Sequence, residues 1–190
     1  MRERHNGQPR SKGREALSWV LCIAGAMVLA LLLRLFVFEL ATVDGQSMEP
    51  TLHSYQALFV EKVSRYSGNI ERGQILIVNY PNEDGVFVKR VVGLPGDEVE
   101  VKGGYLYVNG ERRDENYINC GNGGMDYEME KQTVPKDHYF VMGDNRNDSM
   151  DSHIVGPISK DMIIGHAVCV IWPLGDFGTL GSSGEALKAG

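Results

Sequence analysis

The sequence predicts a mainly β protein, in which a single N-terminal transmembrane helix is followed by a domain built on an antiparallel β-sheet or open barrel. Two observations carry this prediction. One apolar run near the N-terminus is long enough to span a bilayer. The chain after it consists of short apolar segments separated by turns rich in Gly, Pro and Asn, with no long amphipathic helix. A chain of 190 residues has room for one anchor and one domain of ordinary size.

The N-terminal region combines a basic arm with the apolar run. Residues 1–15 carry five Arg or Lys side chains against two Glu, and we expect a disordered cytoplasmic arm. Residues 16–38 are the expected transmembrane helix, because about twenty apolar residues form a helix of about 30 Å. Arg34 lies near the far end, from which its side chain can reach the headgroups. The positive charge before the helix predicts a cytoplasmic N-terminus and an extracytoplasmic remainder.

Two alternatives for the apolar run are a cleaved signal peptide and a buried helix of a soluble protein. The run is longer than the core of a signal peptide, and no Ala-x-Ala-like cleavage site ends it. A retained single-pass anchor in the cytoplasmic membrane is therefore the interpretation we adopt.

Residues 39–180 are expected to form the extracytoplasmic β domain, followed by a flexible tail over residues 181–190. The Asn109-Gly110 pair is typical of a two-residue hairpin turn. Residues 112–132 are polar and rich in Gly, which predicts a long surface connection. The predicted strands cover residues 58–62, 74–79, 86–92, 98–102, 105–108, 138–142 and 163–171.

Composition excludes several classes of function. The formal net charge of −6 argues against a nucleic-acid partner, which requires a clustered basic face. Three cysteines are too few for a disulfide framework and lack the spacing of a metal site. Cys22 lies in the apolar run, so only Cys120 and Cys169 could pair, and their sequence separation does not predict that they do.

A possible nucleophile, Ser47, lies in a turn soon after the apolar run. Serine is common in turns because its hydroxyl bonds the backbone, so Ser47 alone predicts no catalysis. The nine residues after Phe38 place Ser47 within about 30 Å of the membrane edge even in a fully extended chain. Any chemistry of Ser47 would therefore take place near the bilayer.

Two adjacent cations, Lys89 and Arg90, interrupt the β-branched segment at residues 86–92. Their side chains point to opposite faces of a strand, so one of them meets apolar surroundings unless charge protects an edge strand. Both interpretations are open at this point. A buried Lys89 with a pKa about three units below its ordinary value could accept a proton from a serine, without any histidine. The five histidines have no recognisable partner spacing.

Residues 143–153 form a third informative stretch, dense in side chains that hydrogen-bond the backbone in turns. A calcium loop is the obvious metal-binding interpretation. It fails because a loop starting at Asp144 puts Arg146 in a ligand position, and a loop starting at Asn145 lacks the required Gly and closing Glu. The stretch therefore does not predict a metal site.

These stretches, in this order after an anchor, resemble the bacterial type I signal peptidases, a family of Ser-Lys proteases. Residues 47–52 (Ser-Met-Glu-Pro-Thr-Leu) are similar to the nucleophile box, residues 89–97 to the lysine box, and residues 143–152 to the third box. Residues 72–75 are a weaker fourth match. The short connection between the lysine box and the third box is similar to that of the compact Gram-positive members.

The resemblance implies a serine endopeptidase that removes signal peptides from exported preproteins after small residues. Ser47 would attack the scissile carbonyl, Lys89 would be the general base, and Ser149 would hydrogen-bond and orient the lysine. Asp144 and Asp151 would be structural partners of nearby cations. No metal or organic cofactor is implied. The implied partners are signal peptides and membrane lipid, and we expect a monomer.

Two positions depart from the family pattern. Some members carry a hydroxyl two residues before the nucleophile, whereas this chain has Gly45, so the oxyanion would rest mainly on the Ser47 backbone N–H. The third box usually ends in Arg, whereas this chain has His153. A salt bridge from this position to Asp151 would therefore depend on pH.

The resemblance also implies two shallow apolar pockets beside an exposed strand edge, and residues around Val43, Gln46 and Phe87 could line them. Two other functions remain open. The chain could be a Ser-Lys protease dedicated to one client, such as a pilin. It could also be a non-catalytic, membrane-tethered binding module that retains the fold.

Overall fold

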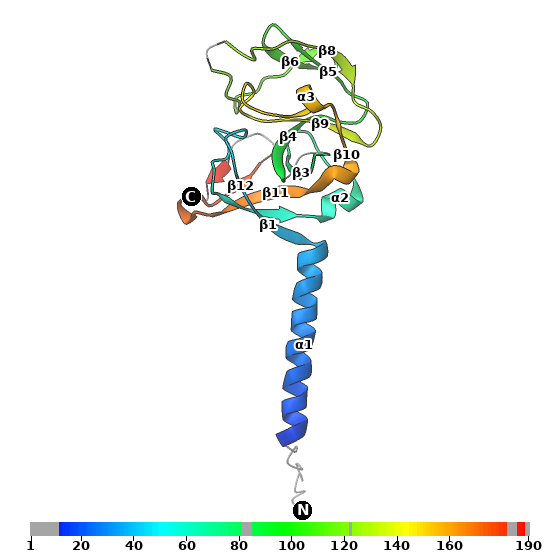
Figure 1. The fold of residues 1–190 in the computed structure, drawn as a ribbon, viewed down its shortest axis with the longest axis vertical. Helices are drawn as coiled ribbons and strands as arrows, with labels where there is room; N and C mark the ends of the chain where they lie inside the picture. The colour runs from blue at the N-terminus through cyan, green and yellow to red at the C-terminus, as the bar shows by residue number, and fades with distance from the viewer. Residues whose placement is uncertain (1–11, 81–84, 122, 182–185, 189–190) are drawn as a thin grey trace, which may run out of the picture. The chain divides into compact units, whose positions relative to one another are not determined.

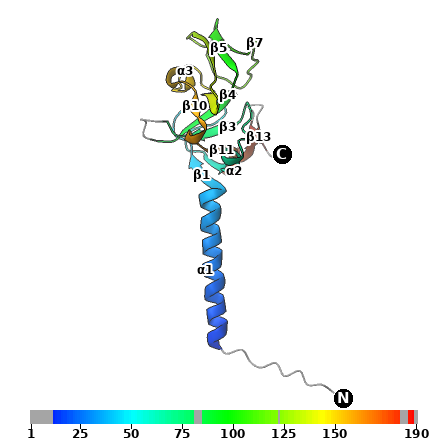
Figure 2. The same ribbon diagram turned by 90° about the vertical axis from the view of Figure 1, so that its right-hand side faces the viewer.

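The computed structural model describes residues 12–80, 85–121, 123–181 and 186–188. The chain divides into two compact units, residues 1–37 and residues 38–190, which we treat separately. The described part of the first unit is the helix α1 (Lys12–Phe36), a single long helix in Figure 2. Its 25 residues correspond to a length of about 37 Å.

Helix α1 has the length and composition of a membrane span. Its apolar window has a mean hydropathy of 2.5 and no buried residue, and no other helix in the described ranges passes the same test. The helix begins four residues before the start of the expected span of 16–38 and ends two residues before the end of that span. It thus includes the last residues of the expected basic arm, of which residues 1–11 lie outside the described part.

The main sheet of the second unit is antiparallel and contains nine strands in the described ranges (Figure 1). Seven strands follow the order β1-β2-β11-β3-β4-β9-β10, and β12 pairs with β11 and with β13. These strands are β1 (Phe38–Thr42), β2 (Ala57–Glu61), β3 (Ile75–Val78), β4 (Phe87–Gly93), β9 (His138–Met142), β10 (Ile158–Ser159), β11 (Ile163–Trp172), β12 (Gly178–Leu180) and β13 (Ala186–Lys188). The prediction of a mainly β, antiparallel fold is confirmed.

A second antiparallel sheet, in the order β7-β6-β5-β8, forms one end of the β domain next to β4 and β9 (Figure 1). It consists of β5 (Glu98–Lys102), β6 (Tyr105–Val108), β7 (Glu111–Arg112) and β8 (Met129–Thr133). The predicted hairpin is confirmed, because Asn109 and Gly110 both have positive φ between paired residues of β6 and β7.

All seven predicted strands are present, with boundaries within one residue of the prediction. The long surface connection expected over residues 112–132 is partly wrong, because β8 begins at Met129. This edge strand exposes most of its side chains and so lacks the apolar residues that identified the others. The tail expected from residue 181 onward also contains a strand, β13, paired with β12. Helical segments of the domain are short: α2 (Val63–Ser67), α3 (Ser152–Val155), and the 3-10 turns 160–162 and 174–176.

Strand β4 is covered on both faces. One hydrophobic cluster includes Leu58, Ile75 and Ile77 from β2 and β3, with Val88 packed against it. On the opposite face, Val91 of β4 belongs to another cluster, together with Leu76 of β3 and Val141 of β9. The last five residues of β4, from Lys89 to Gly93, are all buried. The side chains of β4 therefore face the interior on both sides, which decides the environment of the two adjacent cations.

Candidate active site

Lys89 and Arg90 lie on an interior strand. Strand β4 pairs with both β3 and β9, so the interpretation of an edge strand protected by charge is wrong. Lys89 is 2% exposed and Arg90 is fully buried. Because neighbouring side chains of a strand point to opposite faces, each cation needs its own set of partners.

Lys89 meets Ser47 on one face of β4. Ser47 lies in the turn that follows β1, and the buried side chains of Met48 and Leu52 anchor this turn in the core. The turn begins at Gly45, whose φ of 103° is a conformation that other residues rarely adopt. The Nζ of Lys89 lies 2.7 Å from the Oγ of Ser47, within hydrogen-bond distance.

The environment of Lys89 favours the neutral amine. Burial lowers the pKa of Lys89 from 10.5 to about 8, and the negative charges of Asp151 and then Asp144 oppose this shift. About a tenth of the amine is therefore uncharged at pH 7, and about half of it at pH 8. An uncharged amine at this distance can accept the proton of the Ser47 hydroxyl.

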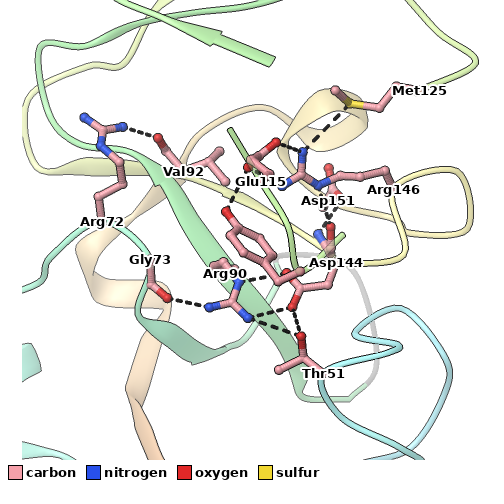
Figure 3. A network of polar contacts seen from close by, with 12 residues as sticks. Thr51, Arg72, Gly73, Arg90, Val92, Glu115, Met125, Asp144, Arg146 and Asp151 are labelled. Atoms are coloured by element: carbon pink, nitrogen blue, oxygen red, sulfur yellow. Dashed lines mark hydrogen bonds and ion pairs between the residues drawn. The ribbon is translucent and has the colours of Figure 1, made fainter. Parts of the chain in front are cut away.

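Arg90 is held on the other face of β4 by a buried network (Figure 3). Its Nε and Nη2 donate to the two carboxylate oxygens of Asp144 at 2.8 and 2.6 Å, and its Nη1 donates to the carbonyl of Gly73 at 2.7 Å. The hydroxyl of Thr51 donates to the same carboxylate at 2.6 Å. Because Thr51 belongs to the turn of Ser47, the network connects β4, the end of β9 and the nucleophile turn.

A second buried ion pair adjoins this network and was not expected from the sequence. Arg146 is fully buried and donates to both carboxylate oxygens of Glu115 at 2.7 Å, and to the carbonyl of Gly143 at 2.9 Å. The ring of Tyr117 lies 4.3 Å from the guanidinium of Arg90. Glu115 and Tyr117 fall in the polar segment after β7, where no periodic pattern distinguishes them from surface residues.

Asp151 and Ser149 lie in the third box beside β9. Asp151 is fully buried, and its Oδ2 accepts the N–H of Gly143 at 2.8 Å. Ser149 is also buried, but its Oγ has no hydrogen-bond partner in the described part of the chain. The hydrogen bond from Ser149 to Lys89 that the resemblance implied is thus not formed in this structure.

Asn145 holds the backbone of the nucleophile and was not among the residues predicted for the site. Its backbone N–H donates to the Ser47 carbonyl at 3.0 Å, and its Nδ2 donates to the Gln46 carbonyl at 3.2 Å. The N–H of Ser47 itself donates to no acceptor within the described ranges. It is therefore free to donate to a substrate oxygen. Gly45 offers no side chain for that purpose, and its carbonyl accepts from Ser54 Oγ at 3.0 Å.

Two cavities follow the free edge of β1, which pairs only with β2 among the described strands. One cavity of about 390 Å³ adjoins Ser47. The other, of about 210 Å³, shares Thr42, Val86 and Val88 with the first and is otherwise mostly aliphatic. Two of the three residues expected to line such pockets, Val43 and Phe87, line the first cavity, and the third, Gln46, does not.

The other cysteine and histidine candidates lie outside this constellation. Cys120 and Cys169 are free thiols, so no disulfide joins them. His166 on β11 lies 3.7 Å from Glu61 on β2, and burial lowers the pKa of His166. Neither feature brings a further nucleophile or base to Ser47.

Known proteins similar to this chain belong to one family. The family described as "Signal peptidase, peptidase S26" matches residues 16–172. Signal peptidase I S of Bacillus subtilis (strain 168) is 41% identical over 175 residues, which are 87% of this chain and 94% of that protein. Signal peptidase I P of Bacillus subtilis subsp. natto is 43% identical over 170 residues, covering 85% and 91%.

A solved signal peptidase I from Enterococcus faecalis V583 is 29% identical and superposes with a TM-score of 0.45, over 52% of this chain and 96% of that one. The match of the family over most of the chain, together with relatives above 40% identity across nearly their whole length, identifies the chain as a member of the signal peptidase family S26.

Proposed function

We propose that this protein is a membrane-anchored serine endopeptidase that removes signal peptides from exported preproteins, with Ser47 as the nucleophile and Lys89 as the general base. The observation that carries the proposal is the 2.7 Å contact between the Ser47 hydroxyl and a buried amine with a lowered pKa. Membership of the signal peptidase family and the names of the relatives support the assignment of the substrate.

The proposed acylation step uses the atoms at the junction of β4 and the nucleophile turn. The neutral amine of Lys89 takes the hydroxyl proton of Ser47 while Oγ bonds to the scissile carbonyl carbon. The electrons of the carbonyl double bond move onto its oxygen, to which the Ser47 N–H donates a hydrogen bond. The tetrahedral intermediate then expels the N-terminal amine of the mature protein, which takes the proton from the Lys89 ammonium. An ester between Ser47 and the signal peptide remains.

Hydrolysis of the ester repeats the same steps with water. Lys89 takes a proton from a water molecule, whose oxygen attacks the ester carbonyl, and the collapse of the intermediate returns the proton to Ser47 Oγ. Ser149 is a positioning residue in this scheme. Its unpartnered Oγ is available to accept a hydrogen bond from Lys89 once acylation has removed the Ser47 hydroxyl as partner. Gly45 contributes no donor to the oxyanion, which rests mainly on the Ser47 N–H.

The substrate binds as an extended strand beside the free edge of β1. Alternate side chains of an extended peptide point the same way, so the first and third residues before the cleavage site face the protein together. The cavities of about 390 and 210 Å³ receive these two side chains. The proposed specificity for small residues such as Ala at both positions follows from the resemblance to the signal peptidases.

The proposed topology is a single pass. A cytoplasmic arm over residues 1–15 precedes the span, the catalytic domain of residues 39–180 lies outside, and the enzyme acts as a monomer in contact with lipid. The basic residues before the span support this orientation. A membrane-impermeant maleimide should label the S67C variant in intact cells, since Ser67 is exposed. Labelling only after the cells are opened would show that the domain lies on the cytoplasmic side.

The test of the activity uses the full chain in detergent and a purified preprotein with Ala before the cleavage site. We expect the wild type to release the mature protein, and S47A and K89M to lose about a thousandfold or more of the rate. The controls S67A and K131M change an exposed serine and an exposed lysine and should cleave normally. Mass spectrometry of the product locates the cut. An inactive wild type, or an active S47A, would favour a non-catalytic binding module instead.

A further inference from the structure

His153 is the ion-pair partner of the buried Asp151. Its Nδ1 lies 2.7 Å from Asp151 Oδ1, and its backbone N–H donates to the same oxygen at 3.2 Å. Within the described ranges, no other cationic side chain lies within ion-pair distance of Asp151, which is fully buried. The compensation of the Asp151 charge therefore depends on whether His153 carries a proton on both ring nitrogens.

The ring of His153 is fixed in place by Tyr127. The two rings are stacked, with centroids 4.1 Å apart and planes 11° from parallel. The side chain of His153 is 15% exposed, so the ring remains able to exchange protons with solvent. Burial, and secondarily the charge of Asp151, raise the pKa of Tyr127 far above physiological pH, so Tyr127 stays neutral. Asp151 is thus the charged group in direct contact with His153.

Asp151 is also connected to the nucleophile through Gly143. Asp151 Oδ2 accepts the Gly143 N–H at 2.8 Å. A Cβ placed on Gly143 would lie only 2.4 Å from the Ser47 carbonyl oxygen and 2.3 Å from Ser149 Oγ. The residue that Asp151 holds is therefore packed directly against the backbone of Ser47.

The two carboxylates that act on Lys89 differ in the cation that neutralises their negative charge. Both Asp151 and Asp144 oppose the lowering of the Lys89 pKa. Asp144 has a permanent countercharge, because it binds Arg90 in two hydrogen bonds. The countercharge of Asp151 is His153, which carries a charge only when its imidazole is protonated. The pair of Asp151 and His153 carries a net charge of −1 when the imidazole is neutral and zero when it is protonated.

We propose that His153 is a positioning residue that, through Asp151, sets the electrostatic field at Lys89 and thereby the pH range in which the enzyme works. When His153 is neutral, Asp151 is uncompensated and the ammonium form of Lys89 is favoured. A permanent positive charge at position 153 would cancel this effect and shift the equilibrium toward the neutral amine. The effect on the pH range of the enzyme rests on the proposed function. The electrostatic coupling between His153 and Lys89 does not.

The first test is the pH profile of kcat/KM for the wild type, H153R and H153N. Arginine also stacks on tyrosine, so H153R can keep the contact with Tyr127 while supplying a permanent charge. Asparagine keeps an N–H donor near the position of Nδ1 without any charge. We expect H153R to move the acid limb to lower pH by about half a unit or more, and H153N to leave it in place. An active H153R with the limb of the wild type, or an equal displacement in H153N, would overturn the proposal.

The second test needs no catalysis and remains decisive if H153R does not fold. NMR of the full chain in detergent, with labelled histidine rings, follows the titration of His153, whose signal is assigned by its absence in H153N. Coupling is reciprocal, so loss of the Lys89 charge in K89M should raise the His153 midpoint by about the same amount. K131M should leave it unchanged. An identical midpoint in K89M and the wild type would refute the coupling.

The two kinds of failure are distinguishable. If S47A cleaves preprotein normally, the proposed function fails while the displacement of the His153 titration by K89M can still be observed. If the midpoint of the His153 titration is the same in K89M and the wild type, the coupling is refuted, while cleavage by the Ser47 and Lys89 pair is unaffected.

Discussion

The Nζ of Lys89 lies 2.7 Å from the Oγ of Ser47, although 42 positions of sequence separate the two residues. Lys89 reaches this position from the interior strand β4, and its side chain is almost completely buried. Ser47 reaches it from a turn whose neighbours Met48 and Leu52 belong to the core. The contact is therefore made by two rigid parts of the domain, which is the requirement for a preorganised proton transfer.

The pH dependence of cleavage follows from the pKa of Lys89. Because the amine acts as a base in its neutral form, kcat/KM should rise with pH through an acid limb near pH 8 and fall as the pH drops below it. Initial rates between pH 6 and pH 10 with the full chain in detergent measure this limb. Equal values of kcat/KM at pH 6 and pH 8.5 would exclude Lys89 as the base.

The buried lysine should reduce the stability of the fold at neutral pH. Its pKa falls from 10.5 in the unfolded chain to about 8 in the folded one, so between these values the unfolded state binds more protons and stability rises with pH. The penalty is complete below about pH 8 and disappears above about pH 10.5. The variant K89M avoids the penalty but loses the hydrogen bond to Ser47.

We therefore expect the free energy of unfolding of K89M to exceed that of the wild type by about 1–3 kcal/mol at pH 7. Between pH 7 and about pH 11 this difference should fall by about 3 kcal/mol, because the wild type loses the penalty. Denaturant unfolding of the full chain in detergent at both pH values measures it. The control K131M changes an exposed lysine and should leave the stability nearly unaltered at either pH. A K89M variant less stable than the wild type at pH 7 would contradict the expectation.

The ion pair between Arg90 and Asp144 should be costly to break from one side. Both side chains are fully buried, so the variant D144N leaves the Arg90 guanidinium without a countercharge. We expect a loss of about 3–5 kcal/mol in the free energy of unfolding. The double variant R90M/D144L removes both charges and should recover most of this loss. If the double variant is as unstable as D144N, the loss of stability comes from altered packing and not from an uncompensated charge.

Gly143 should not tolerate a side chain. A Cβ at this position would lie 2.4 Å from the Ser47 carbonyl oxygen, a backbone atom that cannot move without displacing the nucleophile. We expect G143A to lower kcat at least about tenfold, because small displacements of reacting groups have large effects on rate. The matched control is G175A, whose Cβ would meet nothing within 4 Å. Steady-state kinetics that are normal in G143A would refute the packing argument.

The side chain immediately before the cleavage site should decide whether a substrate is cut. Replacement of Ala by Leu immediately before the cleavage site should abolish cleavage, since the proposed specificity is for small side chains at this position. Replacement by Gly should retain cleavage at a reduced rate. Unimpaired processing of the Leu substrate would refute the proposed specificity for small side chains.

Local sequence patterns predicted strands where apolar residues either alternate with polar ones, as in β5, or follow one another, as in β3. Strand β5 was predicted to the residue because Val99 and Val101 are buried between exposed neighbours. Strand β8 was missed because it lies at a sheet edge and exposes most of its side chains. Strand β1 was missed because its first residue, Phe38, continues the apolar run of the helix. Edge strands depend on backbone pairing with a neighbouring strand, and the residues of the edge strand alone do not predict that pairing.

Within the site, Ser47, Lys89, Asp144 and Asp151 could be predicted as candidates from three short motifs, each made of neighbouring residues. Their partners could not. Glu115 and Tyr117 come from a polar segment without periodicity, and they contact Arg146 and Arg90 only because that segment folds against β4. The same holds for Tyr127, which stacks on His153 from a segment expected to be a surface connection.

The sequence by itself determined the anchor, the antiparallel β class and the residues that can act as nucleophile and base, since length, alternation and short motifs are local properties. Only the tertiary structure decided that Lys89 is buried rather than exposed on an edge strand, because burial depends on which strands pair with β4. It also decided that Ser149 is left without a partner while His153 binds Asp151. Contacts that depend on a few tenths of an ångström between residues far apart in sequence arise from the packing of the whole domain, and no single segment specifies them.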